Sequence, residues 1–154
     1  MKHTIDLTEQ IDGTYWHAAA ILKLDRDPII KAPLEELRFE IGGGAITRRV
    51  QATLGPVVYG HDSLQVPLHW NAAEHPHLFP VMDAQLVISD VGGKHIELHL
   101  VGEYQPPLGA IGGAGDALAG HHVAENSLRG FLTEVAQRLE AELVEHAGRV
   151  GVKR

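Results

Sequence analysis

Histidines and a carboxylate alternate along one segment of this 154-residue chain. His95, Glu97 and His99 are spaced two residues apart, so on a β-strand their side chains point to the same face. Two histidines and a carboxylate suit zinc or non-haem iron. Ile96 and Leu98 between them are apolar, which predicts that the opposite face is buried and that the histidine face is wet. Because a metal centre needs an enclosed, supported ligand set, we expect no metal and no cofactor.

Two charged residues fall on strand faces that are otherwise apolar. Arg48 shares its face with apolar residues of the strand 46–54, and Glu9 shares its face with Ile5, Leu7 and Ile11. A buried charge needs a partner. In one interpretation Arg48 anchors a carboxylate or carbonyl of a ligand, with Glu9 as its counter-ion. In the other, a bulge or a strand end sends either side chain out to water.

The stretch GEYQPPLGAIGGAGDAL at 102–118 resembles a phosphate-binding loop only superficially. A dinucleotide fingerprint needs G-x-G-x-x-G, but Gly113 and Gly115 are followed by Leu118 where the third glycine belongs. Pro106 and Pro107 have no N–H to donate and therefore end the preceding strand. The stretch is interpreted as the connection into a helix, and a hinge remains an alternative. No serine has the context of a nucleophile elbow, so a hydrolase is not supported.

Composition excludes several classes of partner. The chain has 20 acidic and 13 basic residues and a formal charge of -7, which argues against nucleic acid and anionic membranes as partners. It has no cysteine, and no apolar run reaches the ~18 residues of a membrane span. The N-terminus shows no apolar signal region. We expect one cytoplasmic domain over residues 1–154, without membrane insertion.

Hydrophobic periodicity predicts mostly strands and one long helix. Strands are expected at 3–11, 46–54, 57–60, 63–71, 81–90 and 95–104, with a short helix at 15–24 and a long one at 121–146. Residues 25–37 are expected to be irregular chain with at most one helical turn. Pro67 predicts an edge or a bulge in its strand, and Gly92-Gly93 predicts a two-residue hairpin turn. Trp16, Trp70 and Tyr104 fall on apolar faces. The order predicts an α+β fold in which a curved antiparallel sheet wraps around the C-terminal helix.

The run LVGEYQPPLGAIGGAGDAL and the following VAENSLRGFLTEVAQRLEAEL resemble the C-terminal part of bacterial proteins of the START-like (SRPBCC, polyketide cyclase-like) superfamily. The resemblance implies a helix-grip fold with a pocket between sheet and helix for a lipophilic or amphipathic small molecule. A cyclase or aromatase acting on a polyketide-like substrate, and a ligand-free interaction module, remain alternatives, as does a homodimer. The residues expected to line the pocket are Glu9, Arg48, Val66, Leu68, Trp70, Met82, Leu86, Leu98, Tyr104, Leu128 and Phe131.

Overall fold

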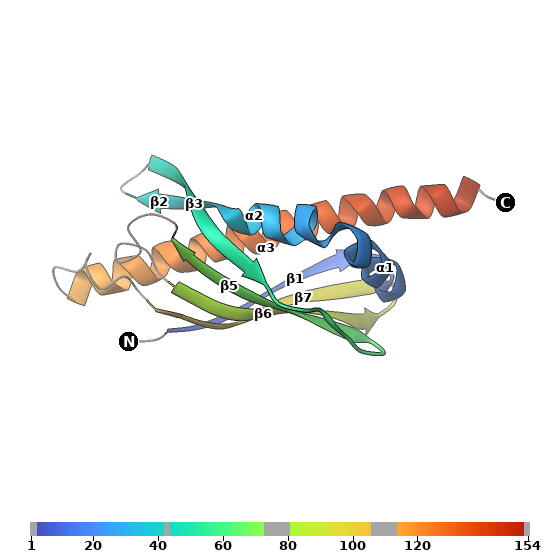
Figure 1. The fold of residues 1–154 in the computed structure, drawn as a ribbon, viewed down its shortest axis with the longest axis horizontal. Helices are drawn as coiled ribbons and strands as arrows, with labels where there is room; N and C mark the ends of the chain where they lie inside the picture. The colour runs from blue at the N-terminus through green and yellow to red at the C-terminus, as the bar shows by residue number, and fades with distance from the viewer. Residues whose placement is uncertain (1–2, 42–43, 73–80, 106–113, 153–154) are drawn as a thin grey trace.

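The computed structural model describes the backbone of residues 3–41, 44–72, 81–105 and 114–152, and the side chains of 3–35, 51–71, 81–105 and 125–146. Figure 1 shows the arrangement. The strands are β1 (His3–Asp12), β2 (Glu36–Ile41), β3 (Gly44–Leu54), β4 (Val58–Tyr59), β5 (Ser63–Ala72), β6 (Val81–Gly92) and β7 (His95–Gln105). The helices are α1 (Tyr15–Arg26), the π-helix η1 (Asp27–Lys31), α2 (Ala32–Glu35) and α3 (Ala114–Val152).

All strands belong to one seven-stranded antiparallel sheet, with the order β1-β7-β6-β5-β3-β2 and with β4 paired to β5. The sheet curls, and α3 runs across its concave side with α2 next to it (Figure 1). α3 contacts strands at both edges of the sheet, β1 and β2. The predicted architecture, a curved antiparallel sheet around a long C-terminal helix, is confirmed.

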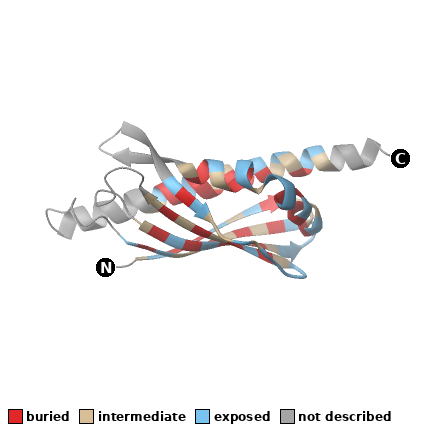
Figure 2. Ribbon diagram, in the orientation of Figure 1, coloured by how far each residue is buried: buried red, intermediate tan, exposed pale blue. Residues whose placement is uncertain are grey.

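Strict alternation along the strands creates the core. Buried and exposed residues take turns along β1, β5, β6 and β7, and the buried positions lie on the side of α3 (Figure 2). On α3 the buried residues recur at steps of three and four: Leu128, Leu132, Val135, Leu139 and Leu143. These two periodicities bring one apolar stripe against one apolar sheet face. Among the described residues, no helix is both long enough and apolar enough to cross a bilayer.

The segment between α1 and β3 departs from the sequence prediction. Irregular chain with at most one helical turn was expected at 25–37; the four-residue α2 matches such a turn, whereas η1 and β2 were not expected. Pro28 falls in the first turn of η1, where its missing N–H costs nothing. Ile29, Ile30 and Leu34 are almost fully buried. Tertiary packing of these apolar residues therefore outweighs the low helix propensity of the proline-containing sequence.

The prediction that Trp16 lies on a buried face is wrong, since 62% of it is exposed. The buried face of α1 is formed instead by Tyr15, Ala18, Ala19 and Leu22. The Tyr15 hydroxyl donates a hydrogen bond to the backbone oxygen of Gly60 at 3.0 Å. Tyr15 packs inward, and Trp16, the next residue and therefore about 100° further round the helix, lies on the exposed side.

Two turn predictions have different outcomes. The hairpin exists, but its two turn residues are Gly93 and Lys94 rather than Gly92 and Gly93, because Gly92 still pairs with His95. Gly93 and Lys94 have positive φ, 64° and 62°, as a two-residue hairpin turn requires. Pro67 does not lie in an edge strand, because β5 lies between β6 and β3. It sits instead between the end of the β3 pairing at Leu68 and the start of the β4 pairing at Gln65. The neighbouring chain leaves the ladder at this point, so the missing N–H of Pro67 breaks no pairing there.

Candidate functional site

One row of side chains crosses the inner face of the sheet near the end where β7 finishes. The strand registers pair His3 with Tyr104, Tyr104 with Met82, Met82 with Trp70, and Trp70 with Ala52. Tyr104, Met82 and Trp70 are at most 2% exposed. The His3 and Tyr104 rings stack with centroids 5.2 Å apart. This aromatic row thus combines a large apolar surface with polar groups on two rings that face the helix side.

Tyr104 is the polar centre of this row. Burial raises the pKa of its phenol to about 12, and the carboxylate of Glu125 on α3 contributes to the rise. Glu125 belongs to the first described turn of α3 side chains, so that turn lies close enough to Tyr104 for the charge to act on it. The buried Ser127 lies two residues after Glu125 in the same helix. At neutral pH the phenol is therefore protonated and uncharged, and its oxygen combines one O–H donor with acceptor capacity in an apolar environment.

The neighbouring row holds the smallest residues of the inner face. Leu68 pairs with Ala84, Ala84 pairs with Gly102, and Gly102 pairs with Ile5. A Cβ at Gly102 would lie only 2.4 Å from the Ala84 Cα and from the Asp83 backbone oxygen. Glycine therefore permits a close approach of β6 and β7 at this bend. Ala84 and Gly102 are the smallest residues on the inner face of β5, β6 and β7.

The structure locates most of the predicted pocket residues. Those on the inner face of the sheet, and the two on α3, are at most 3% exposed; they are Val66, Leu68, Trp70, Met82, Leu86, Leu98, Tyr104, Leu128 and Phe131. Their burial on facing surfaces of sheet and helix is what lining residues of an enclosed pocket need, and a packed core needs it equally. The side chain of Arg48 lies outside the described residues, so its role stays a prediction.

Glu9 does lie on the inner face, half-buried between Leu7 and Ile11. It pairs with Leu98, whereas Tyr104 pairs with His3, six residues away along each strand. At a rise of ~3.4 Å per residue this separation is about 20 Å. Glu9 and Tyr104 therefore do not form one acid–base pair. Glu9 is also far from Arg48 in the sheet order, because β7, β6 and β5 separate β1 from β3.

The outer face carries the histidines, as the alternation predicted. Each of three histidines there contacts one aspartate: His69 Nδ1–Asp83 Oδ1 at 2.6 Å, His95 Nδ1–Asp12 Oδ1 at 2.9 Å and His99 Nε2–Asp6 Oδ1 at 2.6 Å. Among the residues with described side chains, no group of three or more His, Asp or Glu is arranged to hold a metal ion. An open hollow of about 550 Å³ crosses this face. The three histidine–aspartate pairs are well exposed and contribute little to stability.

Sequence reasoning missed three polar residues of the candidate site: His3, Glu125 and Ser127. One signal was available for Glu125, which lies three residues before Leu128 and therefore near the apolar stripe of the helix. A carboxylate next to an apolar stripe is a polar group that must be accommodated close to the core. For His3 the signal was the alternation itself, since His3 lies two residues before Ile5 and therefore on the same face of the predicted strand.

Comparison with known proteins concerns the fold. No family model and no curated protein matches the chain. A conserved protein from Geobacillus kaustophilus is similar in structure, with a TM-score of 0.52, 14% identity, and 89% of this chain and 95% of that chain covered. A protein from Arthrobacter aurescens is also similar in structure, with a TM-score of 0.52 and 12% identity; the match covers 92% of this chain and 86% of that chain. A norcoclaurine synthase from Thalictrum has a TM-score of 0.43 and 11% identity, and the match covers 87% of this chain and 96% of that chain. With its antiparallel sheet curled around a C-terminal helix, this chain has the helix-grip fold expected from the START-like resemblance.

Proposed function

We propose that this protein binds a small apolar or amphipathic molecule between the sheet and α3, above Ala84 and Gly102 and next to Tyr104. The observation that carries the proposal is the change in side-chain size along the inner face. A row with Ala84 and Gly102 is flanked by a row with Trp70, Met82 and Tyr104. Small residues between large ones provide room for a ligand at that level of the sheet.

The chemistry of the surroundings supports a mostly apolar ligand with one polar group. The inner-face residues of β5, β6 and β7 are aliphatic or aromatic apart from the phenol of Tyr104. A buried phenol with a raised pKa donates a hydrogen bond at neutral pH and carries no charge. A carbonyl or hydroxyl oxygen of a ligand is a fitting acceptor for such a donor. An apolar lining with few polar groups is typical of small-molecule sites.

A cyclase-like enzyme acting in the same place is the second candidate, and the pair of Tyr104 with Glu125 favours it. Burial and, to a smaller extent, the carboxylate raise the pKa of the phenol, so the phenol is suited to donate a hydrogen bond to a developing oxyanion rather than to give up its proton. Glu125 and the imidazole of His3 are proton acceptors near it. General acid–base catalysis needs both groups within reach of the same substrate atom or its neighbour. An acid–base role would show as loss of turnover, with retained binding, in Tyr104→Phe.

The test fills the proposed space. Ala84→Leu adds apolar volume above the small row, and Gln85→Leu places the same leucine side chain on the opposite, exposed face of the same strand. N-phenyl-1-naphthylamine, a neutral fluorescent probe, is titrated into each protein, and stability is measured by urea unfolding. If a hollow exists, Ala84→Leu abolishes probe binding and leaves stability unchanged or higher, while Gln85→Leu binds like the parent.

In a solid interior the same substitution overpacks the core. The parent then binds no probe, and Ala84→Leu loses about 1–3 kcal/mol of unfolding free energy. That pair of results would overturn the binding proposal and favour an interaction module without a ligand. The Gln85→Leu control separates effects of added surface hydrophobicity from effects on the interior.

A further inference from the structure

A second hollow, of about 410 Å³, lies on the outer surface between the end of α1 and the segment that leads into β4. Its polar lining consists of Lys23, Arg26, Asp27 and Tyr59. Two cations thus face one carboxylate, which leaves one positive charge in a chain whose formal charge is -7. The lining of the hollow therefore has a sign opposite to the formal charge of the whole chain.

Lys23 lacks the usual partner of a surface lysine. Its Nζ lies 5.2 Å from the centroid of the Tyr59 ring. Across the side chains that the structure describes, Lys23 forms no ion pair with a carboxylate. The face of an aromatic ring attracts an ammonium but accepts none of its three N–H donors as a carboxylate does. Lys23 therefore retains donors and charge for a ligand.

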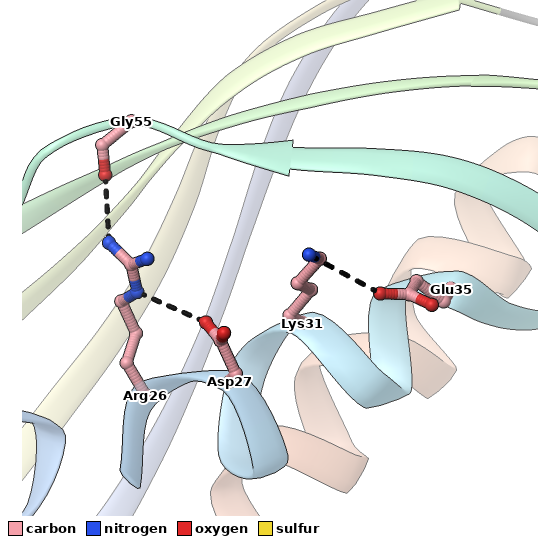
Figure 3. A network of polar contacts seen from close by, with 5 residues as sticks. All are labelled: Arg26, Asp27, Lys31, Glu35 and Gly55. Carbon is pink, nitrogen blue, oxygen red and sulfur yellow. Dashed lines mark hydrogen bonds and ion pairs between the residues drawn. The ribbon is translucent and has the colours of Figure 1, made fainter. Parts of the chain in front are cut away.

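Arg26 is held in place by two contacts that use only part of its guanidinium (Figure 3). Its Nη1 donates to the backbone oxygen of Gly55 at 3.2 Å, and its Nε contacts Asp27 Oδ1 at 3.3 Å. The second distance is long for a charge-assisted hydrogen bond, and the Asp27 side chain is 60% exposed. Asp27 therefore offsets only part of the charge, and the planar fork of Arg26 is already oriented.

The backbone around the two cations is irregular. Asp25, between them, has φ -126° and ψ 33°, outside the helical region. The following turn is the π-helix η1. Single π-helical turns occur frequently at functional sites. The irregularity lies in the same stretch of chain that supplies Lys23, Arg26 and Asp27 to the hollow.

We propose that this hollow binds a small organic monoanion, a carboxylate with an apolar body. The carboxylate would lie between Lys23 and Arg26, since two cations and one acidic side chain leave a single charge to neutralise. The apolar body would cover Leu24, which is 85% exposed, and Val57, which also lines the hollow. The volume falls in the range of ligand sites, roughly 300–1,000 Å³. The site lies outside the interior between the sheet and α3, and it does not depend on the function proposed for that interior.

Benzoate and its neutral analogue benzyl alcohol test the proposal, because they share the ring and differ in charge. Each is titrated by isothermal calorimetry and by ¹H–¹⁵N NMR into the parent, Lys23→Met and Lys31→Met. Lys31→Met is the matched control: it removes the same charge from a residue that pairs with Glu35 and is not part of the lining.

We expect saturable benzoate binding that shifts amide signals of residues 22–28 and 57–59. Lys23→Met should weaken it about tenfold, as loss of a charged hydrogen-bond donor does, and Lys31→Met should leave it unchanged. Equal binding of benzyl alcohol, equal loss in both variants, or shifts that do not saturate would each overturn the proposal. Circular dichroism of Lys23→Met confirms that this exposed substitution leaves the fold intact.

Discussion

Replacing Gly102 with alanine should destabilise the protein, because the bend of the sheet leaves no room for a Cβ. The added atom would lie 2.4 Å from the Ala84 Cα and 2.4 Å from the Asp83 backbone oxygen, whereas ordinary contact begins at 3.4 Å. Both obstacles are backbone atoms, which cannot rotate away as a side chain would. β6 and β7 must therefore separate locally by about 1 Å, the difference between the two distances, at the overpacked position.

The magnitude follows from two costs. Overpacking costs about 1–3 kcal/mol, and a ladder hydrogen bond stretched by the separation costs roughly 1 kcal/mol. Gly102→Ala should therefore lose about 2–4 kcal/mol of unfolding free energy. For a domain of this size 1 kcal/mol corresponds to roughly 2–4 °C, so the Tm should fall by about 5–15 °C. Urea unfolding followed by circular dichroism and differential scanning calorimetry measure the two quantities.

Gly130→Ala provides the matched control. Gly130 is exposed on α3, and a Cβ there meets no atom within 4 Å. Alanine is favoured over glycine inside a helix by about 1 kcal/mol, so this variant should gain stability. If Gly102→Ala is as stable as the parent, or if both variants change in the same direction, the close approach of β6 and β7 does not control the bend.

Three further predictions concern single side chains. Burial raises the pKa of Tyr104 from 10.0 to about 12, so its contribution to the free energy of unfolding is complete below pH 10, and up to ~3 kcal/mol of it is lost as the pH rises from 10 to 12. Over this window the urea midpoint of the parent should fall relative to that of Tyr104→Phe. Parallel curves for the two proteins would contradict the assignment. Leu86→Ala removes a fully buried side chain from the centre of the sheet and should cost about 2–5 kcal/mol by urea unfolding if the interior is packed, with a value below 1 kcal/mol indicating open space instead. Tyr15→Phe removes the hydrogen bond to Gly60 and should cost roughly 1 kcal/mol; hydrogen exchange should then accelerate around residue 60, and unchanged exchange would show that this bond does not fix the turn.

Local pattern was enough to predict most elements and their inner faces. Alternation in β7 predicted both the buried Leu98 and the wet His99, because the side-chain period of a strand is two regardless of its neighbours. The glycine pair at 92–93 predicted the hairpin for the same local reason, although the turn itself lies one residue later, at Gly93 and Lys94. The pattern misjudged Trp16 by one position and missed β2 and η1, because these depend on which surface the rest of the chain offers.

The candidate site required contacts between residues far apart in sequence. His3, Met82, Trp70 and Tyr104 form one row only because the strand order and registers place them opposite one another. Glu125 acts on Tyr104 only because α3 crosses that end of the sheet. No local periodicity encodes either arrangement, since register is set by the fit of whole strands and turns.

By itself the sequence determined the fold class, the two faces of each main strand and the apolar stripe of α3, because these follow from side-chain order along a regular backbone. The tertiary structure decided which end of the sheet carries the polar groups, that Glu9 and Tyr104 are about 20 Å apart, and that Lys23 and Arg26 share a hollow with Tyr59. Those outcomes depend on curvature and helix placement, which arise from packing of the whole chain.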